Sequence, residues 1–311
     1  MKKVVVAMTA AGLVMGFSTF SMAESDIKGT LSNKATVEKS ANVAIGKNAN
    51  ANMGSMAVKN SNVKGTVSND ANIEKSANVA IGENVTANMG SVTMQDANVK
   101  GTISNKAKVA ESANVAIGKD TTANMASVTM KGGSVQGNVS NNAKIEKSAN
   151  VAIGEGTTAN MGSVTMDNSN VKGTVSNKAQ VDKSANVAIG KDTTANMASV
   201  TMKNSNIKGT VSNNAKIEKS ANVAIGEGST ANMGAVTMDN ADIKGTVSNK
   251  AKIGESANVA IGKNTTANMG SVTIKNANVK GTIMNNAKID KSANVAIGEN
   301  STASMGSVAV E

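Results

Sequence analysis

The heptapeptide Ser-Ala-Asn-Val-Ala-Ile-Gly at residues 112–118 decides how the sequence must be interpreted, because it recurs at a fixed interval of 36 residues. Its eight copies begin at Ser40, Ser76, Ser112, Ser148, Ser184, Ser220, Ser256 and Ser292. The interval divides residues 24–311 into eight units without insertion or deletion, at 24–59, 60–95, 96–131, 132–167, 168–203, 204–239, 240–275 and 276–311. Such repetition is typical of a stacked array in which each unit contacts its neighbours.

Apolar residues within one unit lie two positions apart in short runs. In the third unit these runs are Ala97/Val99, Ala107/Val109, Ala113/Val115/Ile117, Ala123/Met125 and Val128/Met130. A period of two predicts short strands with one buried face, and the Gly, Asn, Ser and Asp residues between them are turn formers. We therefore expect an all-β, parallel β-solenoid in which these apolar residues face the core.

Two other interpretations of the repeats compete with the solenoid. An α-helical array would need apolar residues at i, i+3 and i+4, a stripe that the units do not show. Disorder is favoured by the absence of bulky aromatic residues from the repeats, but Val, Ile and Met keep the same phase through all eight units. The phased positions favour a solenoid.

Each unit contains a similar pattern twice, which predicts two coils per unit. Ala-x-apolar runs on either side of Gly101 are followed by the same arrangement around Gly118. Sixteen coils at roughly 4.8 Å each would make a body about 77 Å long. The competing interpretation, one wide coil per unit, needs bulky filling that the repeats lack, and it would stack equivalent lysines such as Lys64 and Lys100 directly on each other.

Residues 1–23 differ from the repeats and are typical of a secretory signal peptide. Lys2 and Lys3 precede an apolar stretch, and Ser21-Met22-Ala23 provides small residues for cleavage. No later stretch reaches the roughly 20 apolar residues of a membrane helix. We expect an exported protein that is secreted or held at the cell surface, with the periplasm as transit or alternative location.

Composition removes most chemistry from consideration. The chain has no Cys, His, Trp, Tyr or Pro, all 32 of its basic residues are Lys, and its only aromatic residues are Phe17 and Phe20. Thiolate nucleophiles, imidazole bases and Cys or His metal sites are therefore excluded. We expect no enzyme, no catalytic residues, no cofactor and no metal site. The net charge is +10, but without Arg or stacking aromatics nucleic-acid binding is not expected, whereas anionic polysaccharide or lipid headgroups fit better.

The Asn-Val-Ala-Ile-Gly segment, as at 114–118, resembles the Ser-Val-Ala-Ile-Gly motif of trimeric autotransporter adhesin heads. The similarity extends to the Ala-Asn-Met-Gly-Ser-Val segment that follows, as at 87–92. It implies a left-handed parallel β-roll and a role at a cell surface or in a matrix. The adhesin repeats are shorter, and these 311 residues contain no pattern of a neck, a coiled-coil stalk or a membrane barrel.

Threonine rows provide the candidate binding surface. One row shares the phase of Thr102, and a second consists of Thr93, Thr129, Thr165, Thr201, Thr237 and Thr273. Regular Thr arrays on a solenoid suggest ice binding, whereas Thr is also an ordinary strand residue facing solvent. Asn114 and its equivalents form an unbroken column, which predicts an amide ladder along the sheet.

Charge alternation between units suggests self-association. The residue after Ala-Ile-Gly alternates between Lys and acid, from Lys47 and Glu83 through to Glu299, so head-to-tail contact of two chains would continue the alternation. We hypothesise a structural protein that self-associates, head to tail or laterally, in an extracellular fibre, matrix or surface adhesin. Its further expected partners are a cell-surface polysaccharide or an outer-membrane anchoring protein. The alternatives are a ligand-binding solenoid, for ice or anionic polysaccharide, and a functional amyloid.

Overall fold

The structure, a computed structural model, describes residues 8–12, 20–23, 26–277 and 279–310. Every helix or strand in these residues is a β-strand, and all strand pairs are parallel. The predicted all-β, parallel β-solenoid is thereby confirmed. Much of the predicted signal peptide lies outside the described residues, as do Glu24 and Glu311 at the bounds of the predicted repeat domain.

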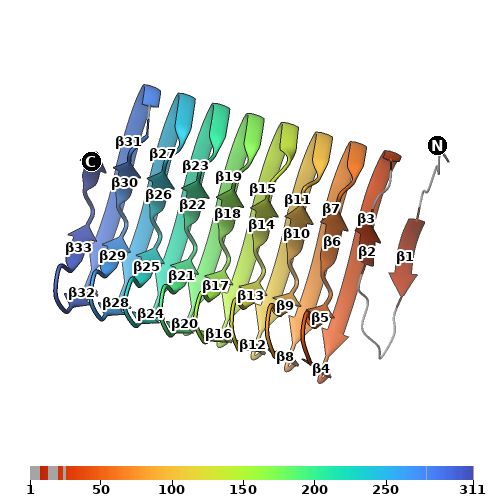
Figure 1. Cartoon of the computed structure of the whole chain (residues 1–311), viewed down its shortest axis with the longest axis horizontal. Coiled ribbons are helices and arrows are strands. Elements are labelled where there is room, and N and C mark those ends of the chain that lie inside the picture. Colours follow the sequence, from red (N-terminus) through yellow and green to blue (C-terminus); the bar gives the residue numbers. More distant parts are fainter. Residues whose placement is uncertain (1–7, 13–19, 24–25, 278, 311) are drawn as a thin grey trace.

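Each unit supplies one long strand and three short ones. In the third unit these are β11 (Asn98–Ala110), β12 (Ala113–Ile117), β13 (Thr122–Met125) and β14 (Val128–Lys131). Equivalent strands of successive units stack into four sheets, here named A to D, which run side by side along the axis of the array (Figure 1).

The long strands form sheet A, which consists of β1 (Met8–Gly12), β3 (Asp26–Glu38), β7 (Asn62–Glu74), β11, β15 (Ser134–Glu146), β19 (Asn170–Asp182), β23 (Asn206–Glu218), β27 (Asp242–Gly254) and β31 (Val279–Asp290). Sheet B consists of β2 (Phe20–Ala23), β6 (Met56–Lys59), β10 (Val92–Gln95), β14, β18 (Val164–Asp167), β22 (Val200–Lys203), β26 (Val236–Asp239), β30 (Val272–Lys275) and β34 (Val308–Val310). Sheet C consists of β4 (Ala41–Ile45), β8 (Ala77–Ile81), β12, β16 (Ala149–Ile153), β20 (Ala185–Ile189), β24 (Ala221–Ile225), β28 (Ala257–Ile261) and β32 (Ala293–Ile297). Sheet D consists of β5 (Asn50–Met53), β9 (Thr86–Met89), β13, β17 (Thr158–Met161), β21 (Thr194–Met197), β25 (Thr230–Met233), β29 (Thr266–Met269) and β33 (Thr302–Met305).

The strand register shows one coil per unit, so the prediction of two coils is wrong. Val99 pairs with Val135 in sheet A, and Asn114 pairs with Asn150 in sheet C, each 36 residues further along the chain. Eight coils at roughly 4.8 Å give an axial length of about 38 Å, half of the predicted value. Lys100 consequently lies directly beside Lys64, the like-charge contact that the two-coil interpretation avoided.

The wide coil is filled by apolar clusters together with columns of buried amides. Val99 and Ile103 of sheet A pack with Val128 and Met130 of sheet B in one apolar cluster. A second cluster joins sheets A and D, and small alanines such as Ala116 form a third between sheets C and D. The sequence lacks bulky side chains, but hydrogen-bonded Asn and Ser side chains occupy the space that they would have filled.

Three buried Asn columns run along the array. Asn105 Nδ2 donates to Asn141 Oδ1 at 2.9 Å, and Asn114 Nδ2 donates to Asn150 Oδ1 at 2.9 Å. In the third column Asn124 Nδ2 donates to Asn88 Oδ1 at 2.9 Å, in the opposite direction along the axis. The predicted amide ladder through Asn114 is confirmed, and two further ladders accompany it.

Gly118 follows the Ala-Asn-Val-Ala-Ile strand because the turn permits no side chain there. Its φ is 140°, and a Cβ atom at this position would overlap the carbonyl oxygen of Gly82 in the preceding coil. Positive φ and close backbone approach are the two conditions that favour glycine over other residues. The expectation that Gly residues between the strands form turns is confirmed at this position.

The described parts of the segment before the repeats extend two sheets. Strand β1 pairs with β3 through Met8 and Leu31, and β2 pairs with β6 through Phe20 and Met56. Across the described ranges, the structure contains no helix with the length and apolarity needed to cross a bilayer.

Candidate interaction surfaces

The six predicted threonines lie together on sheet B, one on each of six consecutive strands. Thr129 separates Val128 and Met130, both of which enter the core, so its side chain points to the opposite side of the strand. Thr93, Thr165, Thr201, Thr237 and Thr273 occupy the equivalent position. The structure thus brings all six predicted residues into one axial row.

The hydroxyl groups of this row are already engaged within their own coils. Thr129 Oγ1 donates to Asn124 Oδ1 at 3.1 Å, and the other five form the same bond over 3.0–3.3 Å. The side chains are half-buried, except that of Thr273, which is buried. A hydroxyl that donates to an internal amide has fewer bonds left for ice or another ligand. A binding role for the row stays a prediction.

Sheet C exposes an aliphatic surface that the sequence analysis did not anticipate. In β12, Asn114 and Ala116 face the interior, whereas Ala113, Val115 and Ile117 point outward. The expectation that these three residues face the core is therefore wrong. Asn114 must face inward to join its ladder, and Ala116 allows close packing against Ala123, so strand alternation places the larger side chains outside.

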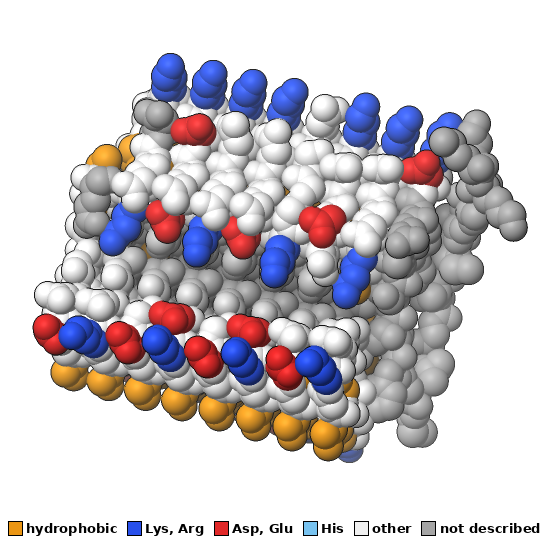
Figure 2. Space-filling view, in the orientation of Figure 1, with side chains coloured by type: hydrophobic (Ala, Val, Ile, Leu, Met, Phe, Trp, Pro, Cys, Tyr) orange, Lys and Arg blue, Asp and Glu red, His pale blue; other side chains and the backbone are white. Residues whose placement is uncertain are grey.

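We call the outward residues of the eight sheet C strands the aliphatic face. Its Ile column has an exposed fraction of 36–37 % in the six inner coils, and Ile45 and Ile297 in the end coils are more exposed. Figure 2 shows a row of hydrophobic side chains along the lower edge of the array, beside a row in which basic and acidic side chains alternate. The retention of Asn at every copy of the heptapeptide is the sequence signal that could have identified this face.

The alternating row borders the aliphatic face and forms ion pairs between adjacent coils. Lys47 Nζ lies 3.3 Å from a Glu83 carboxylate oxygen, and Lys263 Nζ lies 3.0 Å from that of Glu299. These side chains are largely solvent-exposed, so each pair contributes at most about 1 kcal/mol. The row therefore contributes little to the stability of the coil.

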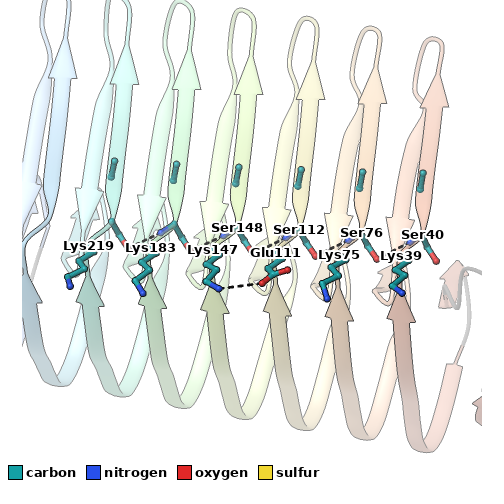
Figure 3. A pocket seen from close by; sticks show the side chains of 18 residues that line it. Lys39, Ser40, Lys75, Ser76, Glu111, Ser112, Lys147, Ser148, Lys183 and Lys219 are labelled. Carbon is teal, nitrogen blue, oxygen red and sulfur yellow. Dashed lines mark hydrogen bonds and ion pairs between the residues drawn. The ribbon is translucent and has the colours of Figure 1, made fainter.

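A shallow groove of about 1150 Å³ follows the other border of the aliphatic face (Figure 3). Three columns of residues line the groove, and they begin at Lys39, Ser40 and Ala41. Glu111 interrupts the Lys column and lies 3.4 Å from Lys147. The residues of this column occupy the tight turn into sheet C with positive φ, as in Lys75 at 50°.

The serines of this groove hold its wall together. Ser112 Oγ donates to the Ala110 carbonyl at 2.7 Å and accepts a bond from the Ser76 backbone N–H at 3.2 Å. The same pair of backbone bonds recurs at Ser76, Ser148, Ser184 and Ser220. Three lysines of the groove, Lys75, Lys147 and Lys219, are ion-paired with Glu74, Glu111 and Glu255.

Acidic side chains are dispersed through the described part of the chain. Within the described residues, no group of three or more Asp or Glu side chains is placed to hold a metal ion. Some acids alternate with lysines along a column, as Glu83 and Glu155 do, whereas others pair with another acid, as Glu146 does with Asp182. Asp70 lies 3.7 Å from Lys106 on the adjacent coil. This arrangement gives surface ion pairs.

Comparison of the chain with protein-family models, with curated proteins and with solved structures found no match.

Proposed function

We propose that the protein is an exported structural protein that self-associates, as a subunit of an extracellular fibre or matrix or of a surface adhesin. The observation that carries this proposal is the aliphatic face. Eight in-register strands of five residues cover about 600 Å² in plan, at the upper end of what a monomer normally exposes in one apolar patch. Interfaces between stable partners bury about 800 Å² on each side, so this face and its borders are of suitable size.

A second copy of the same chain is the occupant that fits the face. Its identical rows of Ala, Val and Ile are spaced by the strand repeat, so a copy offers a surface of the same spacing and flatness. The bordering columns are the alternating row from Lys47 to Glu299 and the Lys/Glu column from Lys39 to Lys291. Two copies related by a two-fold axis can face each other with their solenoid axes parallel or antiparallel. With the coils in register, both arrangements place more opposite than like charges against each other along these borders.

Axial association is a second contact of the same kind. The last described coil leaves Met305 and Val308 about half exposed, at 45 % and 49 %. The Asn ladders and the alternating row give each coil the same donors, acceptors and charge order as its neighbours, so another coil can add in the same register. Lateral and axial contacts together would build a sheet or fibre.

The oligomeric state of the full chain tests the proposal. Sedimentation equilibrium is expected to give oligomers, and the double variant I117D/I189D is expected to be monomeric because it places two charges in the apolar contact. The matched control S104D/S176D adds the same charges on sheet A and should keep the oligomer. A wild-type chain that stays monomeric at about 100 μM, far above the Kd of micromolar complexes, would overturn self-association.

A further inference from the structure

Half of the protein's 32 lysines lie on the outward side of sheet A, between two outward columns that contain acids, in phase with Asn98 and Ala110. We call the outward positions in phase with Lys100, Thr102, Ser104, Lys106 and Lys108 the basic face. Its lysines are Lys28, Lys34, Lys64, Lys100, Lys106, Lys108, Lys144, Lys172, Lys178, Lys208, Lys216, Lys244, Lys250, Lys252, Lys280 and Lys288. Asp70 is the only acid among these positions. The fold thus concentrates lysines that look evenly spread along the sequence.

One column of this face places like charges directly against each other. Lys172, Lys208 and Lys244 pair in register on adjacent strands, roughly 4.8 Å apart. No acid alternates with them in this column, which contrasts with the row beside the aliphatic face. Like charges opposite each other destabilise a sheet, and a bound polyanion would remove that repulsion.

The columns of Lys106 and Lys108 line two hollows on the same face. The first, of about 500 Å³, is lined by charged and amide side chains from Asp70 to Gln180. The second, of about 400 Å³, continues to Lys288 and shares Lys178 and Gln180 with the first. Asp70 is the only acid in either lining, and it already lies 3.7 Å from Lys106.

The lining is suited to a polymer that carries both anionic and hydroxyl groups. Lys ammonium groups donate to carboxylate or sulfate, and amides such as Asn142, Gln180 and Asn214 both donate and accept. Nucleic acid fits less well because residues 26–310 contain neither Arg for phosphate forks nor aromatic rings for base stacking.

We propose that the basic face binds a linear anionic polysaccharide that lies along the solenoid axis, with its acidic groups on successive lysine columns. The spacing of one lysine per coil matches an extended chain that repeats its charge at nearly every sugar. The outward column next to that of Lys108 contains acids, including Glu146 and Asp182. These acids and Lys144 and Lys216 line a separate small hollow, so this column marks the edge of the basic face. This proposal does not require self-association, because each chain carries the whole face.

Binding of polygalacturonate to the full chain tests this proposal. The variant K100Q/K144Q/K172Q/K216Q changes positions in two columns that already contain Gln, at Gln136 and Gln180, so the fold accepts the substitution. The control K47Q/K119Q/K191Q/K263Q removes the same charge from the row beside the aliphatic face.

Calorimetric titration at low salt is expected to show binding by the wild type and the control, and a loss of at least about tenfold in affinity for the basic-face variant. The logarithm of affinity should also fall less steeply with the logarithm of salt concentration in that variant, because fewer lysines contact the polymer. Equal losses in both variants, or no binding by the wild type, would overturn the proposal. So would tighter binding of oligo(dT) or of vesicles containing phosphatidylserine.

Discussion

A single residue, Asn114, shows how this chain manages without large side chains. Its Nδ2 donates to Asn150 Oδ1 and to the carbonyls of Ala87 and Asn124, and its Oδ1 accepts from Asn78 at 2.8 Å. Every polar atom of this fully buried side chain is therefore paired. Buried amides are stable only when satisfied in this manner, and the 36-residue period satisfies them in every coil.

Asn114→Ala is expected to lower the free energy of unfolding by about 1–3 kcal/mol, because it leaves buried carbonyl and amide groups unpaired. Urea denaturation and hydrogen exchange of β8, β12 and β16 would measure the loss. Asn142→Ala is the control, since Asn142 is exposed and its side chain has no hydrogen-bond partner in the described protein. Equal stability of the two variants would show that the ladder contributes nothing.

At the scale of the element, sheet C illustrates a strand whose inner side is more polar than its outer side. Burial of Asn and Ala inside and exposure of Val and Ile outside follow from ladder formation and close packing of sheets C and D. One complete coil consists of all four strands, because paired residues of successive units lie 36 positions apart.

Removal of residues 132–167, one complete coil, is expected to leave a folded seven-coil solenoid. The deletion joins Lys131 to Asn168, so β11 meets β19 in the same register. Removal of residues 113–132, one of the two halves suggested by the internal pattern, deletes the three short strands and should prevent the coil from closing. Circular dichroism and the urea midpoint would distinguish them. Comparable folding of both deletions would contradict the single wide coil.

The whole molecule is a slab with different chemistry on its faces. Sheet A carries the basic face and sheet C the aliphatic face, and a row of alternating charges borders the aliphatic face (Figure 2). Each column contains one residue per coil. A residue type that occupies one position of the repeat unit therefore forms a row along the surface. Repetition thus produces extended surfaces of uniform chemistry from a few side chains.

The dimensions of the slab provide a prediction at this scale. Eight coils extend about 38 Å along the axis, and a 13-residue strand of sheet A extends about 43 Å across it. Negative-stain images should therefore show particles about as long as they are wide, and axial fibres should repeat near 38 Å. Rods about 77 Å long would contradict the strand register.

The sequence alone determined the strand class, the unit boundaries and the amide ladder, because a fixed period forces equivalent residues such as Asn114 and Asn150 into one column. It did not determine the number of coils per unit. The pattern around Gly101 recurs around Gly118 and suggests two coils, but the two segments lie in one coil, and the residues that pair between units are 36 positions apart. Nor did it identify the outward side of Val115 and Ile117, or gather the lysines onto one face. Those features depend on which strand packs against which, and apolar alternation gives the period of a strand without specifying the side that faces the core.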